Sequence, residues 1–498
     1  MNKRAHMASP RLSLFKVLRF STVGSALVLC LLGCPLGLVF ADPLGTIDPT
    51  QSVDWARGAI SHAQKMRAHK DVDKGSQSAP GAIPTFSVDS DPSGQIATFQ
   101  PEGSTAKGNN AFFQNLGTNG RTCFTCHQPQ TGWTISAASA QARFAASSGA
   151  DPLFRLVDGA TCPTADVSNP VAKLKAYQLL LEKGLIRIGL PLPTTNLQFE
   201  VDIDKVEDPY NCTTSKDTGL TSKTTGIMSM YRRPLPSTNL GFLTAIMWDG
   251  REPSLAHQSV DATLIHAQAN GAGPTGDKQE EIVAFETGIF TAQELDNEAG
   301  PLHADGENGG PRALSEEIAN FFVGVNDPVG LNPKGLPFDP NIFDLYFAPN
   351  FSGKPDKTGG VADHRASIVR GEQIFNGTQI NITGVTGLND ALNLSTIPGF
   401  CGTCHDTPNV GNHSVKAPLN IGIANAGADK PPALDISGLP VFTLQCKTGP
   451  LAGRTFVVTD PGRAMITGQC ADMARSKDPS CVGSLLGRPT SIMGRQQL

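Results

Sequence analysis

The chain has 498 residues, of which 39% are hydrophobic and 17% are charged, and its formal net charge at pH 7 is -5. A chain of this length accommodates two or three domains. The mild acidity argues against nucleic acid or an anionic membrane surface as a partner, because both favour a concentrated basic face. The 52 glycines and 37 prolines predict that much of the chain is loop.

Residues 1–41 are typical of an export signal. Basic residues precede an apolar run over residues 23–40, and Ala41 is the small residue favoured before a signal-peptidase cut. One alternative is a transmembrane anchor, for which the run is just long enough. Another is lipoprotein processing at Cys34. Cleavage is the preferred hypothesis, and it predicts a periplasmic protein with no transmembrane span in the mature chain.

Eleven cysteines are present, and two of them lie in the signal segment. In an oxidising compartment, Cys162 with Cys212 and Cys446 with Cys470 make sensible local disulfides. Cys481 is then the odd cysteine.

Two Cys-x-x-Cys-His motifs, at 123–127 and 401–405, are the strongest signals in the sequence. Two thiols at this spacing can each add to one vinyl group of a single haem, and the adjacent histidine is then held under the iron. A zinc half-site or a redox dithiol is the alternative, but zinc needs further paired ligands nearby, and neither motif has them. The predicted attachment and ligand residues are Cys123, Cys126, His127, Cys401, Cys404 and His405.

Regular elements are predicted around these motifs. Residues 110–113 form a short lead-in to the first motif. Asn169 can cap a helix that Pro170 opens and that runs to about Lys183, with Gly184 as its stop.

Alternating apolar and polar residues predict a half-buried strand at 197–203. A helix is expected at 313–323. Before the second motif, Asp363 could cap a helix over 365–375, with Ile368 and Phe375 on its apolar side.

The expected organisation follows from these positions. It comprises a signal (1–41), an N-terminal extension (42–100), a first haem domain (101–360) with an insert around 160–215 and a linker region at 270–360, a second haem domain (361–473) and a divergent tail (474–498). The insert either shapes a substrate entrance or is a decorated loop.

Between the motifs, Trp248-Asp249-Gly250-Arg251 is followed by Gln258, and this order resembles the bacterial di-haem cytochrome c peroxidase and MauG family. The resemblance implies a mainly α fold, with two cytochrome c-like haem domains, long loops and a small β-containing insert. It also implies that Trp248 lies between the haems, one of which binds peroxide or oxygen while the other relays electrons. A core tryptophan is the alternative for Trp248. Calcium is expected from the resemblance only.

The chain departs from the family where an acid/base is needed. Peroxidases of the family carry an acidic residue twenty positions after the tryptophan, whereas this chain has Gln268, which cannot shuttle a proton. Gln258 does match a glutamine of the family pocket. His266 could take over the proton transfer, ligate iron or be a surface histidine. The catalytic candidates are therefore Trp248, Gln258, His266 and Gln268.

No histidine lies between the first motif and His257, so the first haem is expected to have an open or weakly occupied sixth position. Met228, Met230 and Tyr231 are possible substitutes. For the second haem, the candidates are His413 and Met465.

The last 25 residues lack the segment with which the family completes its second haem pocket. One hypothesis is an altered reading frame after about Met473, and the alternative is a divergent terminus. Resequencing the gene distinguishes the two.

The sequence therefore favours an oxidoreductase that reduces hydrogen peroxide at the His127 haem. Electrons would come from a small donor protein, such as a cytochrome c or a cupredoxin, through the His405 haem. The alternatives are a MauG-like or rubber-oxygenase-like enzyme acting on dioxygen, and a non-catalytic electron carrier.

Overall fold

The computed structural model describes residues 81–474 except for 213–219, 222–225, 331, 348–349, 356, 391, 415–418 and 429–434. The predicted signal, Cys481 and all but the first residue of the divergent tail lie outside the described residues. Ala474 is buried, and its carbonyl accepts hydrogen bonds from Thr386 Oγ1 (3.0 Å) and Asn420 Nδ2 (3.1 Å).

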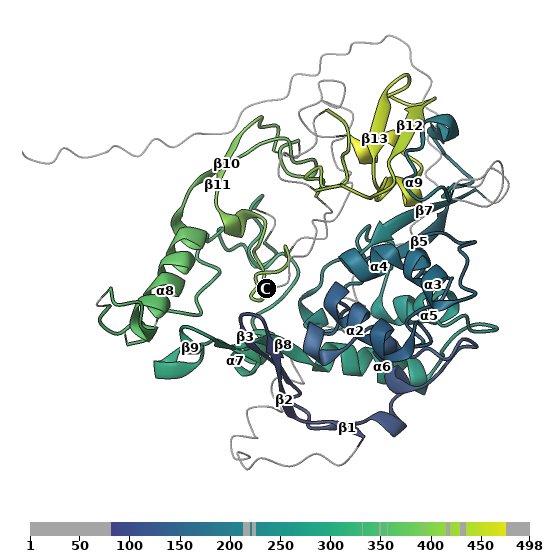
Figure 1. Ribbon diagram of the computed structural model, residues 1–498. Coiled ribbons are helices and arrows are strands. Elements are labelled where there is room, and N and C mark those ends of the chain that lie inside the picture. Colours follow the sequence, from purple (N-terminus) through teal and green to yellow (C-terminus); the bar gives the residue numbers. More distant parts are fainter. Residues whose placement is uncertain are drawn as a thin grey trace, which may run out of the picture. The chain divides into compact units, whose positions relative to one another are not determined.

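The α-helices of the described part have between 4 and 17 residues, and α8 is the longest (Figure 1). They are α2 (Ala137–Ser147), α3 (Pro170–Ala176), α4 (Gln178–Lys183), α5 (Leu255–Ile265), α6 (Asp277–Gly288), α7 (Pro311–Glu317), α8 (Val361–Gly377) and α9 (Ala464–Thr467). Single 3-10 turns supplement them, including η2 (Ala111–Phe113), η3 (Cys123–Thr125) and η8 (Cys401–Thr403).

The strands form several small antiparallel sheets. They are β1 (Ala82–Ile83), β2 (Phe86–Asp91), β3 (Gly94–Phe99), β4 (Thr105–Ala106), β5 (Ile186–Pro191), β6 (Phe199–Val201), β7 (Ile227–Arg232), β8 (Phe290–Asp296), β9 (Gly300–Pro301), β10 (Ile380–Ile382), β11 (Ile397–Gly399), β12 (Phe442–Cys446) and β13 (Thr455–Val458). The largest sheet has the order β2-β3-β8-β9, and a second has the order β13-β12-β6.

The expectation of a mainly α fold is wrong. Of the described residues, 28% are helical and 18% are extended, so neither class dominates. Part of the missed strand content lies in the β2–β3 hairpin, within the expected N-terminal extension. Its turn is stabilised by Asp91, whose carboxylate accepts hydrogen bonds from the amides of Ser93 (2.6 Å) and Gly94 (2.9 Å).

The insert between Cys162 and Cys212 folds largely as its sequence predicts. The Asn169 side chain accepts hydrogen bonds from two amides at the start of α3, and Gly184 ends α4 in the left-handed conformation. The helix is interrupted at Tyr177, whose buried ring packs against Phe154. Both expected disulfides are present, with Cα–Cα distances of 5.2 Å for Cys162–Cys212 and 6.2 Å for Cys446–Cys470.

The strand expected at 197–203 is shorter, because β6 covers only Phe199–Val201. It pairs with β12 in the register Leu444↔Val201 and Cys446↔Phe199. The insert is therefore joined by backbone hydrogen bonds to the part of the chain that follows the second motif.

The expected linker region, 270–360, contributes regular structure around the first motif. Helix α6 places Ile282 and Phe285 in one buried cluster with Phe112 and Trp133. Strand β8 pairs with β3 along its length. The helix expected at 313–323 occurs as α7, which begins and ends earlier in the chain.

Helix α8 leads to the second motif. It begins before the expected residue 365, and Gly360, not Asp363, occupies the N-cap. The carboxylate of Asp363 instead accepts hydrogen bonds from the preceding amides of Lys357 (3.0 Å) and Gly359 (2.8 Å). The predicted apolar side is confirmed, because Ile368 packs in a hydrophobic cluster and the Phe375 ring lies 6.2 Å from the ring of His405.

A buried carboxyl on α8 gives the fold a pH dependence. Glu372 is 2% exposed and accepts a hydrogen bond from the Tyr346 amide (3.0 Å). Burial raises the pKa of Glu372 to about 7, and the neighbouring Glu307 adds to the effect.

Glu372→Gln is expected to stabilise the protein at about pH 8, by roughly 1–3 kcal/mol, and to have little effect at about pH 5. The folded state holds a proton on Glu372 up to a pH near 7, whereas the unfolded chain releases it near its ordinary pKa. Stability from this group therefore falls as the pH rises between the two values. Urea denaturation at both pH values measures the effect. The exposed Glu280→Gln is the control, and equal responses of the two variants would contradict the prediction.

Candidate functional site

The first motif forms a compact turn around its cysteines. Residues Cys123–Thr125 make the 3-10 turn η3, and the His127 amide donates to the carbonyl of Cys123 (3.1 Å). The hydroxyl of Thr125 accepts a hydrogen bond from the Thr122 amide (3.0 Å), which closes the turn from the other side.

The second motif repeats this structure far away in the sequence. Residues Cys401–Thr403 form η8, and the His405 amide donates to the Cys401 carbonyl (3.0 Å). The Thr403 hydroxyl accepts from the Phe400 amide (2.9 Å). The shared Cys-x-Thr-Cys-His sequence therefore produces the same backbone and the same threonine contact twice.

Both motif histidines are oriented by a backbone carbonyl. Nδ1 of His127 lies 2.8 Å from the Trp133 oxygen, and Nδ1 of His405 lies 2.9 Å from the Val410 oxygen. A carbonyl can only accept, so Nδ1 carries the hydrogen and the Nε2 lone pair is free to bind a metal. Burial lowers the pKa of both rings, to about 4 for His127, so each is a neutral imidazole at pH 7.

The four motif cysteines are unpaired, although the four other described cysteines form disulfides. Burial raises the thiol pKa of Cys123 and Cys126, and it raises the pKa of Cys404 to about 12. Redox-active Cys-x-x-Cys pairs need the opposite shift, because the thiolate is the reactive form. The raised pKa values of these buried thiols therefore argue against a dithiol–disulfide enzyme.

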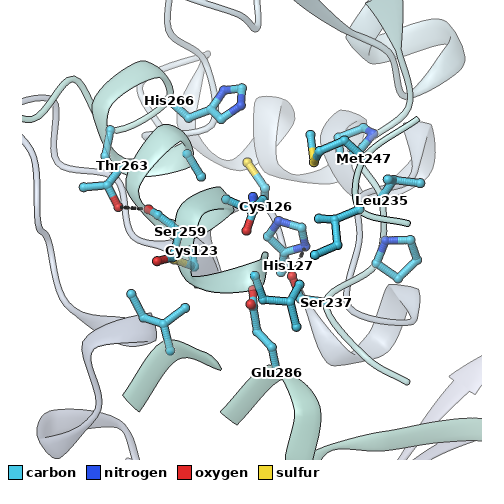
Figure 2. Close-up of a pocket in the computed structure, with 18 of the residues that line it drawn as sticks. Cys123, Cys126, His127, Leu235, Ser237, Met247, Ser259, Thr263, His266 and Glu286 are labelled. Atoms are coloured by element: carbon cyan, nitrogen blue, oxygen red, sulfur yellow. Dashed lines mark hydrogen bonds between the residues drawn. The ribbon is translucent and has the colours of Figure 1, made fainter. Parts of the chain in front are cut away.

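A pocket of about 1250 Å³, part of it open to solvent, lies against the first motif (Figure 2). Its wall is mostly apolar and includes Leu235, Leu243 and Ile246, while Arg233 and Arg251 add positive charge. The residues fit a c-type haem, because apolar walls suit a porphyrin ring and guanidinium groups suit its propionates.

The Trp-Asp-Gly-Arg segment forms one edge of this pocket. Trp248 lines it, and its indole N–H donates to the carbonyl of Arg233 (2.9 Å). Asp249 is fully buried and forms ion pairs with Arg232 (2.7 Å) and Arg251 (2.9 Å). Burial alone would raise the pKa of Asp249, but these guanidinium groups hold it below its usual range. Asp249 therefore anchors the segment, and Trp248 lies at the pocket wall.

The residues just before this segment touch the loop that follows the second motif. The Thr244 hydroxyl donates to the carbonyl of His413 (3.0 Å), and the Phe242 carbonyl accepts from Asn412 (3.5 Å). Leu243 and Met247 line the pocket of the first motif. A short stretch of backbone therefore lies between the two motif regions.

His266 is part of the pocket wall. It follows α5, and its Nδ1 lies 2.6 Å from the carboxylate of Asp158. Asp158 is buried and also pairs with Arg121 (2.6 Å). Burial opposes ionisation of Asp158, but Arg121 and His266 hold its pKa below the usual range. With Nδ1 engaged, His266 has Nε2 left for a proton or a metal.

The two glutamine candidates separate in space. Gln258 on α5 lines the pocket. Gln268 is exposed: α5 ends at Ile265, and Gln268 adopts the left-handed conformation with φ 54°. Its side chain bonds Asn119 (3.3 Å) instead. The residue twenty positions after Trp248, Gln268, therefore lies outside the pocket and does not occupy the place of the family's acid/base.

The expected substitutes for a distal histidine lie elsewhere. Met228 and Met230 are buried on β7 in one hydrophobic cluster with Met465, and the Tyr231 hydroxyl donates to the carbonyl of Thr161. Met228, Met230 and Tyr231 therefore do not line the pocket of His127, and Met465, a candidate for the second haem, packs in the same cluster as the two methionines. His413 is buried in the loop after the second motif.

Four pocket residues had no sequence signal of their own. Arg121, Asp158, Ser237 and Glu286 line the pocket and are buried. Glu286 lies in the region expected to be a linker, and Asp158 reaches His266 from more than a hundred residues away. Of the four residues, only Arg121 lies next to the first motif in the sequence.

One further group could hold a metal. Glu252, His257 and Asp261 offer ligand atoms within 4.8 Å of one another. Calcium prefers six to eight oxygen ligands, and this group offers one atom each from two carboxylates and an imidazole. The residues therefore do not fit the calcium ion that the resemblance implies.

No family model, curated protein or solved structure matches this chain. No helix in the described part of the chain is long and apolar enough to cross a membrane. The geometry of the pocket must therefore carry the functional argument.

Removing either partner of the Arg121–Asp158 pair is expected to destabilise the protein by about 3–5 kcal/mol, since a buried charge is left uncompensated. The variants are Arg121→Met and Asp158→Asn, and urea denaturation gives the free energy of unfolding. The double variant should lose less than the sum of the two single losses, because the partners share one interaction. Additive losses would contradict a direct pair, and His266→Ala, which leaves the pair intact, is the control.

Proposed function

We propose that the chain carries one c-type haem at each Cys-x-x-Cys-His motif and reduces hydrogen peroxide at the haem bound by His127. The observation that carries the proposal is the pocket in which His127 and His266 are both present, each with Nδ1 held by a fixed partner. One imidazole is then available as an iron ligand and the other for proton transfer.

The motif cysteines would hold the haem by thioether bonds, and their unpaired state supports this role. When bound, the haem supplies the redox chemistry, and the protein supplies orientation and electrostatics. The apolar wall excludes water from the ring, and Arg233 and Arg251 can pair with its propionates.

Reduction of peroxide to water consumes two electrons and two protons, and the O–O bond breaks as its oxygens are protonated. His266 can take a proton from peroxide at Nε2 and return it to the leaving oxygen. Asp158 keeps the other nitrogen protonated and stabilises the imidazolium that forms in between. Arg121 keeps Asp158 ionised for this task.

Electrons would come from a small donor protein and pass through the haem at His405. Trp248 and the residues before it offer the route, because this segment lines the pocket and contacts the loop after the second motif. The two disulfides support an oxidising compartment, in agreement with the proposed export to the periplasm.

A non-catalytic electron carrier is the second candidate. The observation that favours it is the Asp158–His266 contact, since metal-ligating histidines commonly donate their other N–H to a carboxylate. If His127 and His266 both served as iron ligands, no position would be left for peroxide. The spin state of the ferric haem separates the two functions.

His266→Ala is expected to slow the reaction with hydrogen peroxide by about 100-fold or more, because the general acid/base is lost. Stopped-flow absorption of the haem-loaded protein measures this rate. Gln268→Ala, outside the pocket, is the matched control and should react like the wild type.

The carrier would give different spectra. Both ferric haems would be low-spin and inert toward peroxide, and His266→Ala would create a high-spin haem. That result would overturn the proposed peroxidase function. Stopped-flow absorption with dioxygen in place of hydrogen peroxide tests whether the protein is instead an oxidase or oxygenase.

Trp248→Phe is expected to slow electron transfer between the haems and to leave both reduction potentials unchanged. The substitution removes the indole from the shared segment, whereas the anchor at Asp249 remains. Rapid reduction of the oxidised protein, followed at each haem, measures the transfer. A wild-type transfer rate would show that Trp248 is a wall residue only.

A further inference from the structure

Glu286 is a buried acid in the pocket for which the proposed reaction has no use. It projects from α6 and is 4% exposed. Its Oε2 has no hydrogen-bond partner in the part of the chain that the structure describes. Burial raises its pKa to about 7, and a hydrogen bond with Ser237 opposes the shift. A buried carboxyl with one oxygen left without a partner is costly, so its position calls for a function.

Ser237 connects Glu286 to the ligand of the first motif. The Ser237 hydroxyl lies 3.1 Å from Nδ1 of His127, on the side of the ring opposite the metal-binding nitrogen. In Figure 2, Glu286 extends toward Ser237 and His127, while His266 lies on the other side of the histidine. His127, Ser237 and Glu286 therefore form a row that starts at Nδ1 of the imidazole.

The direction of the hydrogen bonds in this row follows from the chemistry. The Trp133 carbonyl accepts from both the Ser237 amide (2.9 Å) and Nδ1 of His127 (2.8 Å). Nδ1 therefore carries the hydrogen, and the Ser237 oxygen can only accept from it. The hydroxyl hydrogen is then directed to Glu286, whose oxygens accept it. The row runs from imidazole N–H to hydroxyl to carboxyl.

The second motif has no equivalent row among the described residues. Nδ1 of His405 bonds the Val410 carbonyl, and the nearby Asp406 accepts from the amide and hydroxyl of Ser414. The contrast identifies the row as a feature of the first motif and not a general requirement of the turn.

We propose that Glu286 is a positioning residue that acts through Ser237 on His127 and lowers the reduction potential of the haem bound there. A carboxyl at the end of the row draws the Nδ1 hydrogen outward and makes the imidazole a stronger donor to iron. A stronger donor stabilises the oxidised iron more than the reduced iron. This inference rests on the proposed haem attachment.

The test is a potentiometric titration of the haem-loaded protein at about pH 9, where Glu286 is ionised. Glu286→Gln keeps the shape and an acceptor oxygen but removes the charge, and Ser237→Ala removes the connection. Each should move the potential of one haem to more positive values and leave the other haem unchanged. The affected haem should be the one whose spectrum also responds to His266→Ala. A tenfold change in the reduction equilibrium corresponds to 59 mV for one electron.

The double variant should shift the potential no further than the larger single shift, because both residues act along one path. The Fe–His stretching frequency of the reduced haem should fall in both single variants. Ser259→Ala is the matched control, since this pocket hydroxyl bonds the Ala256 carbonyl and not the row.

Unchanged potentials, or shifts that add in the double variant, would overturn the inference even if both haems are present. Counting haems per chain by the pyridine haemochrome spectrum keeps the two proposals apart. A chain that takes up fewer than two haems would contradict the proposed function, and not only the role of Glu286.

Discussion

The hydrogen bond between the buried His127 ring and the Trp133 carbonyl is the constraint on which the site depends. It fixes the tautomer of the ring, and with it the nitrogen that is offered to a metal. The carbonyl is itself held firmly, because Trp133 is fully buried, packs on Phe112 and Phe285, and donates its indole N–H to Thr98. Strand β3 and helix α6 therefore fix the orientation of the His127 ring, although neither element contains a motif residue.

The two motifs share a local structure but differ in their surroundings. Around the first, two pairs of buried polar or charged side chains line the pocket: Arg121 with Asp158, and Ser237 with Glu286. Around the second, Asp406 is buried against Ser414, where burial raises its pKa to about 7. Equal sequence motifs are thus placed in unequal electrostatic environments, which is how one chain can assign different tasks to two similar groups.

The sequence predicted what depends on neighbouring residues. The cap at Asn169 and the stop at Gly184 follow from local chemistry, and the two disulfides follow from the order of the cysteines in the chain. It did not predict contacts between distant segments: Asp158 with His266, Ser237 with Glu286, or β6 with β12. Gln268 was misplaced because the end of α5 changes the direction of the chain. The mainly α expectation is wrong because it rests on the resemblance alone, which does not account for local strand signals such as the Asp91 turn.

The pairing of β6 with β12 limits how the molecule can be dissected. An insert that looks detachable supplies the edge strand of a sheet whose other strands follow the second motif. A fragment that ended before β12 would leave β6 with unpaired backbone groups, and deletion of the insert would expose the edge of β12 to other chains. A cut anywhere between β6 and β12 therefore divides this sheet, because its strands lie on either side of the second motif in the sequence.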